Sequence, residues 1–221
     1  MSDTRPAPRA RNVDATQILA SWFSPAYPVG AYSYSHGLEW VVERGEVTGR
    51  EALRDWIEDL LRHGAGRSDA ILLAATFRAE DPAPLAELAE ALAPSSERHL
   101  ETMAQGGAFA RTTAAVWGID LPAMAYPVAV GRAAALLDLP LRPTLTLFLQ
   151  GFAANIVSAG VRLIPLGQTD GQRITADLMP LCAAIAAEAE AATLDDLGGS
   201  ALGADLAAML HETQYTRLYR S

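Results

Sequence analysis

The chain has 221 residues, a formal net charge of −9 at pH 7, and 50% hydrophobic residues. So acidic a chain is poorly suited to neutralising a phosphate backbone, so nucleic acid is not expected as a partner. Frequent alanine, with few β-branched or aromatic clusters, favours helices packed on helices. We therefore expect an all-α fold, a single globular domain of about ten helices around a buried central helix.

The predicted domain covers residues 14–210. Residues 1–13 carry prolines and charges without an apolar stretch, so we expect a disordered arm that is neither signal peptide nor anchor. Cys182 is the one cysteine and lies among apolar residues, which fits a buried thiol in a reducing cytoplasm. Residues 143–161 lack formal charges, but their polar side chains would need partners in hydrocarbon. A core helix is therefore favoured over a membrane span.

Capping residues and apolar periodicity predict the helices in chain order. Asp14 with Gln17 opens a first helix that stops at residues 24–25. A second helix is expected to start at residue 32 or 33 and to end at Gly45. Later helices are expected to begin at Thr48 with a capping box to Glu51, at Ser68, near Leu85, at Ser95 or Ser96, at Pro127, near Thr144, at Thr169 with a capping box to Gln172, and near Ala204.

Two of these helices carry further expectations. The segment near residues 144–164 is apolar nearly all round, so it is predicted to be the core helix. Pro180 is expected to kink or break the helix that opens at Thr169, because proline has no N–H to donate. The helix that begins at Ser95 or Ser96 contains Gly106 and Gly107, and such small residues permit close approach by a neighbouring helix or subunit.

Residues 24–39, SPAYPVGAYSYSHGLE, combine a proline- and glycine-rich turn with three tyrosines and a Ser-His pair. An enzyme would use Ser33, Ser35, His36 and Glu39, but neighbouring helical residues point about 100° apart and no G-x-S-x-G motif is present. His36 with Glu39 gives at most two metal ligands, so no metal site is predicted and His36 is the one candidate ligand. No phosphate-binding loop occurs either.

The segment HETQYTRLYRS, residues 211–221, ends an acidic chain with tyrosine and arginine. A frayed terminus is the ordinary explanation. However, tyrosine and arginine are enriched at interface hot spots, so we favour a partner-docking tail. The residues expected to bind partners are Tyr215, Arg217, Leu218, Tyr219 and Arg220.

Three blocks, residues 24–39, RLIPLGQTDGQ at 162–172 and the tail, together resemble the urease accessory protein UreF family. Ala31, where many members carry glycine, and Tyr219, where phenylalanine is common, keep the size or aromatic class. The signature or structural residues in these blocks are Pro25, Pro28, Gly30, Tyr32, Ser35, His36, Gly37, Glu39, Gln168 and Gln172.

The resemblance implies a non-catalytic, all-helical protein that binds UreD (also called UreH), dimerises and recruits the nickel-carrying GTPase UreG to apo-urease. It implies no tightly bound cofactor, with nickel handled by the complex. The tail would dock on UreD and help form the surface that receives UreG, and the signature residues would shape that region. Deleting residues 211–221 would then abolish the complex and leave a folded protein.

Two questions stay open at the level of sequence. The alternative function is a helical enzyme or ligand-binding regulator with a pocket lined by Tyr32, Tyr34 and His36. Within the accessory role, the chain either activates the GTPase or restrains it, and Arg217 or Arg220 is conceivable as an arginine finger.

Overall fold

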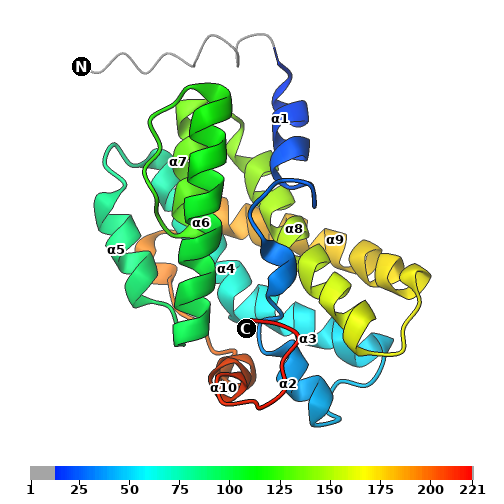
Figure 1. The fold of residues 1–221 in the computed structure, drawn as a ribbon. Helices are drawn as coiled ribbons and strands as arrows, with labels where there is room; N and C mark the ends of the chain where they lie inside the picture. The colour runs from blue at the N-terminus through cyan, green and yellow to red at the C-terminus, as the bar shows by residue number, and fades with distance from the viewer. Residues whose placement is uncertain (1–12, 221) are drawn as a thin grey trace.

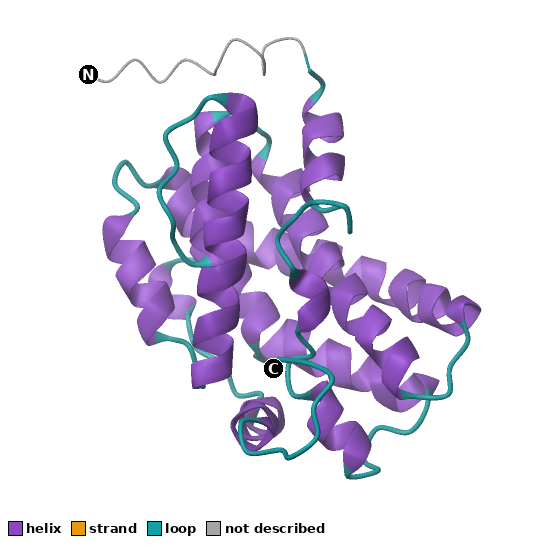
Figure 2. Ribbon diagram, viewed as in Figure 1, coloured by secondary structure: helices purple, strands orange, loops and turns teal. Residues whose placement is uncertain are grey.

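The computed structural model describes residues 13–220, and this part of the chain folds into helices and loops without a strand (Figures 1 and 2). The all-α prediction is therefore confirmed. The predicted arm, apart from Val13, lies outside the described residues. The α-helices are α1 (Ala15–Trp22), α2 (Leu38–Glu43), α3 (Arg50–His63), α4 (Ala65–Arg78), α5 (Ala83–Ala91), α6 (Ser96–Trp117), α7 (Tyr126–Leu136), α8 (Leu141–Leu163), α9 (Gln168–Ala191) and α10 (Leu202–His211). Two short 3-10 helices, η2 (Ala31–Ser33) and η3 (Leu194–Asp196), complete them.

Helix α4 lies at the centre of the fold. It packs against α3, α5, α7, α8 and α9, and five consecutive residues, 70–74, are buried. Burial on all sides explains why this helix shows no clean amphipathic stripe in the sequence. The core helix predicted from composition, α8, shares the centre by packing along α9, but it keeps one face toward solvent.

Helix α8 is also the one candidate membrane span among residues 13–220, judged by length and composition alone. Half of its most apolar window, 50%, is buried inside the protein. The helix packs against α1, α2, α3, α4 and α9. Packing inside the domain therefore accounts for the apolar character of this helix.

Several helix starts follow the predicted capping chemistry. The Asp14 carboxylate accepts a hydrogen bond of 2.6 Å from the Thr16 N–H and caps α1. The Ser95 hydroxyl accepts a hydrogen bond of 3.2 Å from the Arg98 N–H and caps α6. Pro127 stands in the first turn of α7, where its missing N–H costs nothing.

Other starts differ from prediction because a glycine takes the capping position. Gly49 precedes α3 and Gly167 precedes α9, both without a side-chain cap, so the two predicted capping boxes do not form. Gly64 ends α3 and opens α4 at once, three residues before the predicted start at Ser68. Glycine permits such abrupt corners because it lacks a Cβ.

Pro180 neither breaks nor ends α9, which runs without interruption from Gln168 to Ala191. Pro180 and Ala176, four residues earlier, both lie at exposed positions. The Ala176 carbonyl, which loses its helical donor, can therefore bond to water. The prediction of a break was wrong because it ignored which side of the helix the proline would occupy.

The small residues of α6 serve contacts within the chain. A Cβ on Gly106 would lie 1.9 Å from the Met124 carbonyl oxygen and 2.7 Å from the Tyr126 nitrogen. The segment leading into α7 therefore presses directly on the α6 backbone. The predicted close approach is made by a neighbouring segment, so Gly106 gives no support for a subunit interface.

Candidate functional site

The signature segment folds as a loop, the short helix η2 and a second turn before α2 begins. Gly30, His36 and Gly37 all have positive φ, at 77°, 55° and 74°. Such residues cannot sit inside an α-helix, so the helix predicted from residue 32 or 33 starts only at Leu38 and ends at Glu43. A Cβ on Gly37 would lie 2.9 Å from the Ala207 Cβ, which shows how closely this turn approaches α10.

The first polar group at this turn, named here the inner cluster, comprises His36, Asp69, Arg98, Glu101 and Gln105. The Glu101 carboxylate lies 3.1 Å from the His36 Nε2 and accepts a hydrogen bond of 2.9 Å from the Gln105 side chain. Arg98 forms an ion pair with Glu101, and its other guanidinium nitrogen lies 4.0 Å from Asp69. The inner cluster thus joins the signature turn to α4 and α6.

Burial and neighbouring charges shift the pKa values in the inner cluster. Burial alone would raise the pKa of Glu101, but Arg98 and His36 outweigh it and lower that pKa to about 2. Burial raises the pKa of Asp69 to about 6, against the attraction of Arg98. Burial, helped by Arg98, lowers the pKa of His36 despite Glu101. The buried histidine is therefore favoured in its neutral form.

The second polar group, named the tail cluster, comprises Glu39, Glu97, His211 and Arg217. His211 is fully buried, with its Nε2 3.1 Å from Glu39 and its Nδ1 2.7 Å from Glu97. Arg217 donates a hydrogen bond of 2.6 Å to Glu97. The Glu39 carboxylate also accepts hydrogen bonds from two successive tail amides, those of Leu218 at 2.7 Å and Tyr219 at 2.9 Å.

Further contacts fix the path of the tail, which turns back from α10 toward α2 (Figure 1). The Arg220 N–H donates to the Ser33 carbonyl at 2.8 Å. The Tyr219 ring is buried, with the Arg162 guanidinium 5.2 Å from its centroid. At the other end, the Glu212 carboxylate accepts the Ser96 N–H at 2.8 Å, at the start of α6, where backbone donors are free.

The predicted partner-binding residues therefore divide into two sets. Tyr215 and Leu218 are exposed, at 102% and 76% of the full residue surface. Tyr219 faces inward, and Arg217 is held by Glu97. Their role in binding partners stays a prediction, but the structure brings Leu218, Tyr219 and Arg220 into contact with the signature segment at Ser33 and Glu39.

The signature residues also separate by position. Ser35 is buried, and its hydroxyl accepts the Glu39 N–H at 3.3 Å. Gln168 and Gln172 are exposed on α9, outside both clusters. The pair His36 and Glu39 does not share a metal-facing side, because His36 precedes α2 and turns to Glu101 while Glu39 turns to His211. Among residues 13–220, no three His, Cys, Asp or Glu side chains are grouped to hold a metal ion.

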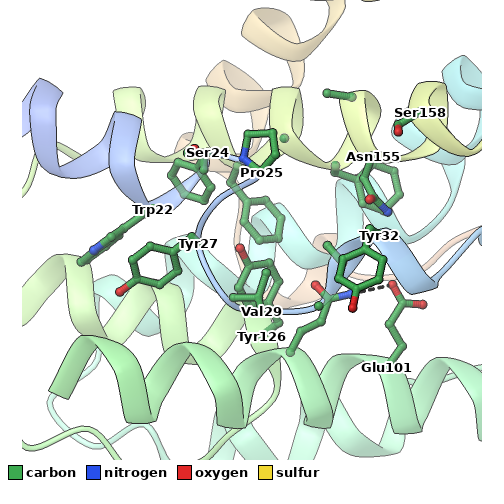
Figure 3. A pocket seen from close by; sticks show the side chains of 18 of the residues that line it. Trp22, Ser24, Pro25, Tyr27, Val29, Tyr32, Glu101, Tyr126, Asn155 and Ser158 are labelled. Carbon is green, nitrogen blue, oxygen red and sulfur yellow. Dashed lines mark hydrogen bonds between the residues drawn. The ribbon is translucent and has the colours of Figure 1, made fainter. Parts of the chain in front are cut away.

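A cavity of about 460 Å³ lies under the signature loop, between α6 and α8 (Figure 3). Tyr32 and His36 line it, as the ligand-binding alternative requires, but Tyr34 does not. The Tyr34 carbonyl instead accepts a hydrogen bond of 3.3 Å from Asn155. Aromatic side chains form much of the remaining wall, and the inner cluster closes one end.

Sequence reasoning missed the partners on α6, Glu97, Arg98 and Glu101, and the bridging place of His211. One signal was available in the sequence. The α6 positions 97, 98, 101, 105 and 109 fall on one helical stripe, which starts with charged residues and ends with the apolar Phe109. Charges on an otherwise core-facing stripe indicate a buried polar cluster, although they do not name its distant partners.

A helical fold in which one polar cluster joins its helices and another binds its own tail defines an accessory or binding protein better than a catalyst. The comparisons agree with this class. A family model described as UreF matches residues 47–179. The chain belongs to the UreF family of urease accessory proteins.

The relatives named "Urease accessory protein UreF" match along nearly their whole length. A protein of Cereibacter sphaeroides is 56% identical, covering 92% of this chain and 97% of the relative. Proteins of Ruegeria pomeroyi and Roseobacter denitrificans are 52% and 50% identical, covering 92% and 95% of this chain and 95% and 96% of the relatives. The chain is accordingly an accessory protein and not an enzyme.

Proposed function

We propose that this chain assists urease maturation by binding UreD (UreH) and by recruiting or regulating the GTPase UreG, so that nickel reaches apo-urease. The observation that carries the proposal is the arrangement of the tail. Its backbone and polar groups are bound to the domain, while Tyr215 and Leu218 project into solvent. Rigid aromatic and apolar side chains presented in this way are suited to bury themselves in a partner.

The outer face of α10 supports the same surface. Four large apolar residues on this helix are 45–69% exposed, and they lie directly before the tail. Monomeric proteins rarely leave such neighbouring apolar side chains uncovered without a partner. The exposed residues are Leu202, Leu206, Met209 and Leu210. We assign them, with Tyr215 and Leu218, to the contact with UreD.

The two tail arginines bear on the regulation of UreG. Arg217 bonds Glu97, and the Arg220 side chain bonds the Tyr34 side chain. Each bond ties its guanidinium to the domain, whereas an arginine finger must reach out to a phosphoryl group in trans. This arrangement favours recruitment of the GTPase over an arginine-finger role in the tail.

The remaining parts of the proposal rest on the family alone. We place the chain in the cytoplasm, as a homodimer without a tightly bound cofactor, with nickel carried by the complex. Gly106 no longer supports the dimer, because the same chain covers it.

The test compares two double variants of the purified protein by co-elution with UreD and UreG. Tyr215→Ala with Leu218→Ala removes exposed side chains of the tail, whereas Leu100→Ala with Met179→Ala removes exposed apolar side chains elsewhere. The tail variant is expected to lose the complex and the control to keep it. Retention of the complex by the tail variant would reject the proposed surface.

Substitution is a cleaner test than deleting residues 211–221. Deletion would remove His211 and Arg217 and leave Glu39 and Glu97 buried without their partners. A second assay follows urease activation in cells that contain the tail variant. Inactive, nickel-poor urease at normal abundance supports delivery, and a normal nickel content contradicts it.

A further inference from the structure

We infer that Glu39 is the positioning residue that holds the tail in the shape its partners recognise, an inference that rests on the proposed function. Glu39 lies in the first turn of α2, just after the left-handed turn at His36 and Gly37. That turn aims one carboxylate at the tail, where it meets two consecutive backbone amides and the His211 ring. No other side chain among residues 13–220 bonds both amides.

The geometry makes Glu39 an acceptor for the backbone of residues 218 and 219 as well as for the His211 ring. Its two oxygens accept the Leu218 and Tyr219 N–H groups separately, at 2.7 and 2.9 Å. Successive amides that converge on one anion form a concave binding arrangement, and hydrogen bonds to a charged acceptor are stronger than neutral ones. Because consecutive residues are fixed, the directions of their side chains are fixed as well.

The difference in burial between Leu218 and Tyr219 shows the effect of holding their two amides in place. Leu218 is 76% exposed and Tyr219 is 6% exposed, although they are adjacent. Tyr219 packs inside the domain, and Leu218 faces outward. If Glu39 released the two amides, this alternation would no longer be enforced.

His211 and Glu97 brace the carboxylate from behind. The His211 ring stands between Glu39 and Glu97, and Glu97 in turn holds Arg217. The tail is thus attached at its start by His211, in its middle by Arg217 and near its end by the two amides. Partner binding then selects the attached form, so apparent affinity falls with the fraction of chains that adopt it.

The experiment uses the full chain with Glu39→Gln, and Glu51→Gln as the matched control, because Glu51 is exposed on α3 and contacts only Arg50 among the described ion pairs. Hydrogen exchange of the Leu218 and Tyr219 amides is measured in the free protein. Glu39→Gln is expected to speed that exchange about ten-fold or more. The glutamine amide has only one acceptor oxygen, and its NH₂ group would face one of the two backbone N–H donors. Exchange in α3, α4 and α8 should stay unchanged.

Binding to UreD and UreG is then measured for the same variants. Glu39→Gln is expected to weaken binding about ten-fold or more, and Glu51→Gln to leave it unchanged. Should Glu39→Gln fail to fold, Glu39→Asp keeps the charge beside His211 while shortening its reach, and an intermediate effect is expected. Unchanged amide exchange in both Glu39 variants overturns the inference.

The double variant Tyr215→Ala with Leu218→Ala separates this inference from the proposed function. If it loses binding while its backbone amides stay protected, and Glu39→Gln binds normally despite fast exchange, the positioning role is wrong and the docking surface stands. If the double variant binds normally, the proposed surface itself fails, whatever the exchange of the Leu218 and Tyr219 amides shows.

Discussion

The inner cluster and the tail cluster use the same types of side chain for different purposes. Each sets a histidine against a buried glutamate with an arginine beside it, His36, Glu101 and Arg98 in one and His211, Glu97 and Arg217 in the other. In the inner cluster, the carboxylates accept the described hydrogen bonds from side chains that lie on the signature turn or on α6. In the tail cluster, Glu39 also receives main-chain donors. The same chemistry therefore joins helices inside the core in one place and attaches the tail to the domain in the other.

Removing Glu101 should have the largest effect and would test whether the inner cluster is structural. Glu101→Ala leaves Arg98 and His36 buried without their shared acceptor, and breaking a buried pair costs about 3–5 kcal/mol. Urea unfolding should show a lower midpoint with an unchanged slope. A loss below about 1 kcal/mol would contradict the core role assigned to this cluster.

Substituting Glu97 should lower the free energy of unfolding less than removing Glu101, but it should increase amide exchange in the tail more. Glu97→Gln weakens the bonds to His211 and Arg217, and hydrogen bonds to charged groups contribute about 1.5–3 kcal/mol each before relaxation. We expect a net loss of about 1–2 kcal/mol in the free energy of unfolding, because Arg217 can turn to solvent. Tail amide exchange should rise more steeply than exchange in α4. Equal changes in both would show that the tail is no separate unit.

Asp69 should change stability in the opposite direction. Its pKa of about 6 in the folded chain lies above the ordinary value of 3.8, so ionisation costs stability as the pH rises between about 4 and 6. Asp69→Asn removes this cost and should stabilise the protein at pH 7.5. We expect about 1–2 kcal/mol, since Asp69 is partly exposed and Arg98 loses a neighbour.

Thermal or urea unfolding across pH 3.5 to 8 checks the sign. The gain from Asp69→Asn should be complete above about pH 6 and absent below about pH 4. Glu101 behaves in the opposite way. Its pKa of about 2 lies below the ordinary 4.5, so its contribution is present above pH 4.5 and is lost as the pH falls toward 2. A pH-independent gain in Asp69→Asn would contradict this account.

The smallest effect on stability is expected at Tyr215. Its side chain is fully exposed, so Tyr215→Ala should change the free energy of unfolding by less than about 0.5 kcal/mol. Melting temperature with and without UreD provides the measurement. A strong loss in the free protein would mean that Tyr215 supports the fold and does not serve contact alone.

Local chemistry made much of the fold predictable. Ser95 before α6 and Pro127 within α7 mark helix starts through the hydrogen bonds they make or omit. Pro180 misled prediction because its effect depends on the side of α9 that faces water. The signature turn misled it because His36 and Gly37 both take positive φ where Gly37 packs closely on α10, far away in sequence.

Many residues of the candidate site could be identified from the sequence, but the contacts between them could not. The tail residues and Glu39 were both identified from the sequence, but nothing local indicates that one binds the backbone of the other. Of the inner cluster, His36 was identified in the signature segment, whereas the members on α6 were recognisable only as polar residues on its buried stripe. Contacts between residues 172 to 180 positions apart depend on the whole fold and have no periodic signature.

The distance along the chain between Glu39 and Tyr219 also orders events during synthesis. The two residues are 180 positions apart, so at ribosomal rates Glu39 is made roughly ten to forty seconds before its amide donors. Until the tail is synthesised, the Glu39 carboxylate and the turn at His36 lack the segment that covers them. The proposed docking surface is consequently one of the last parts of this domain to be completed, and a prematurely stopped chain would lack it.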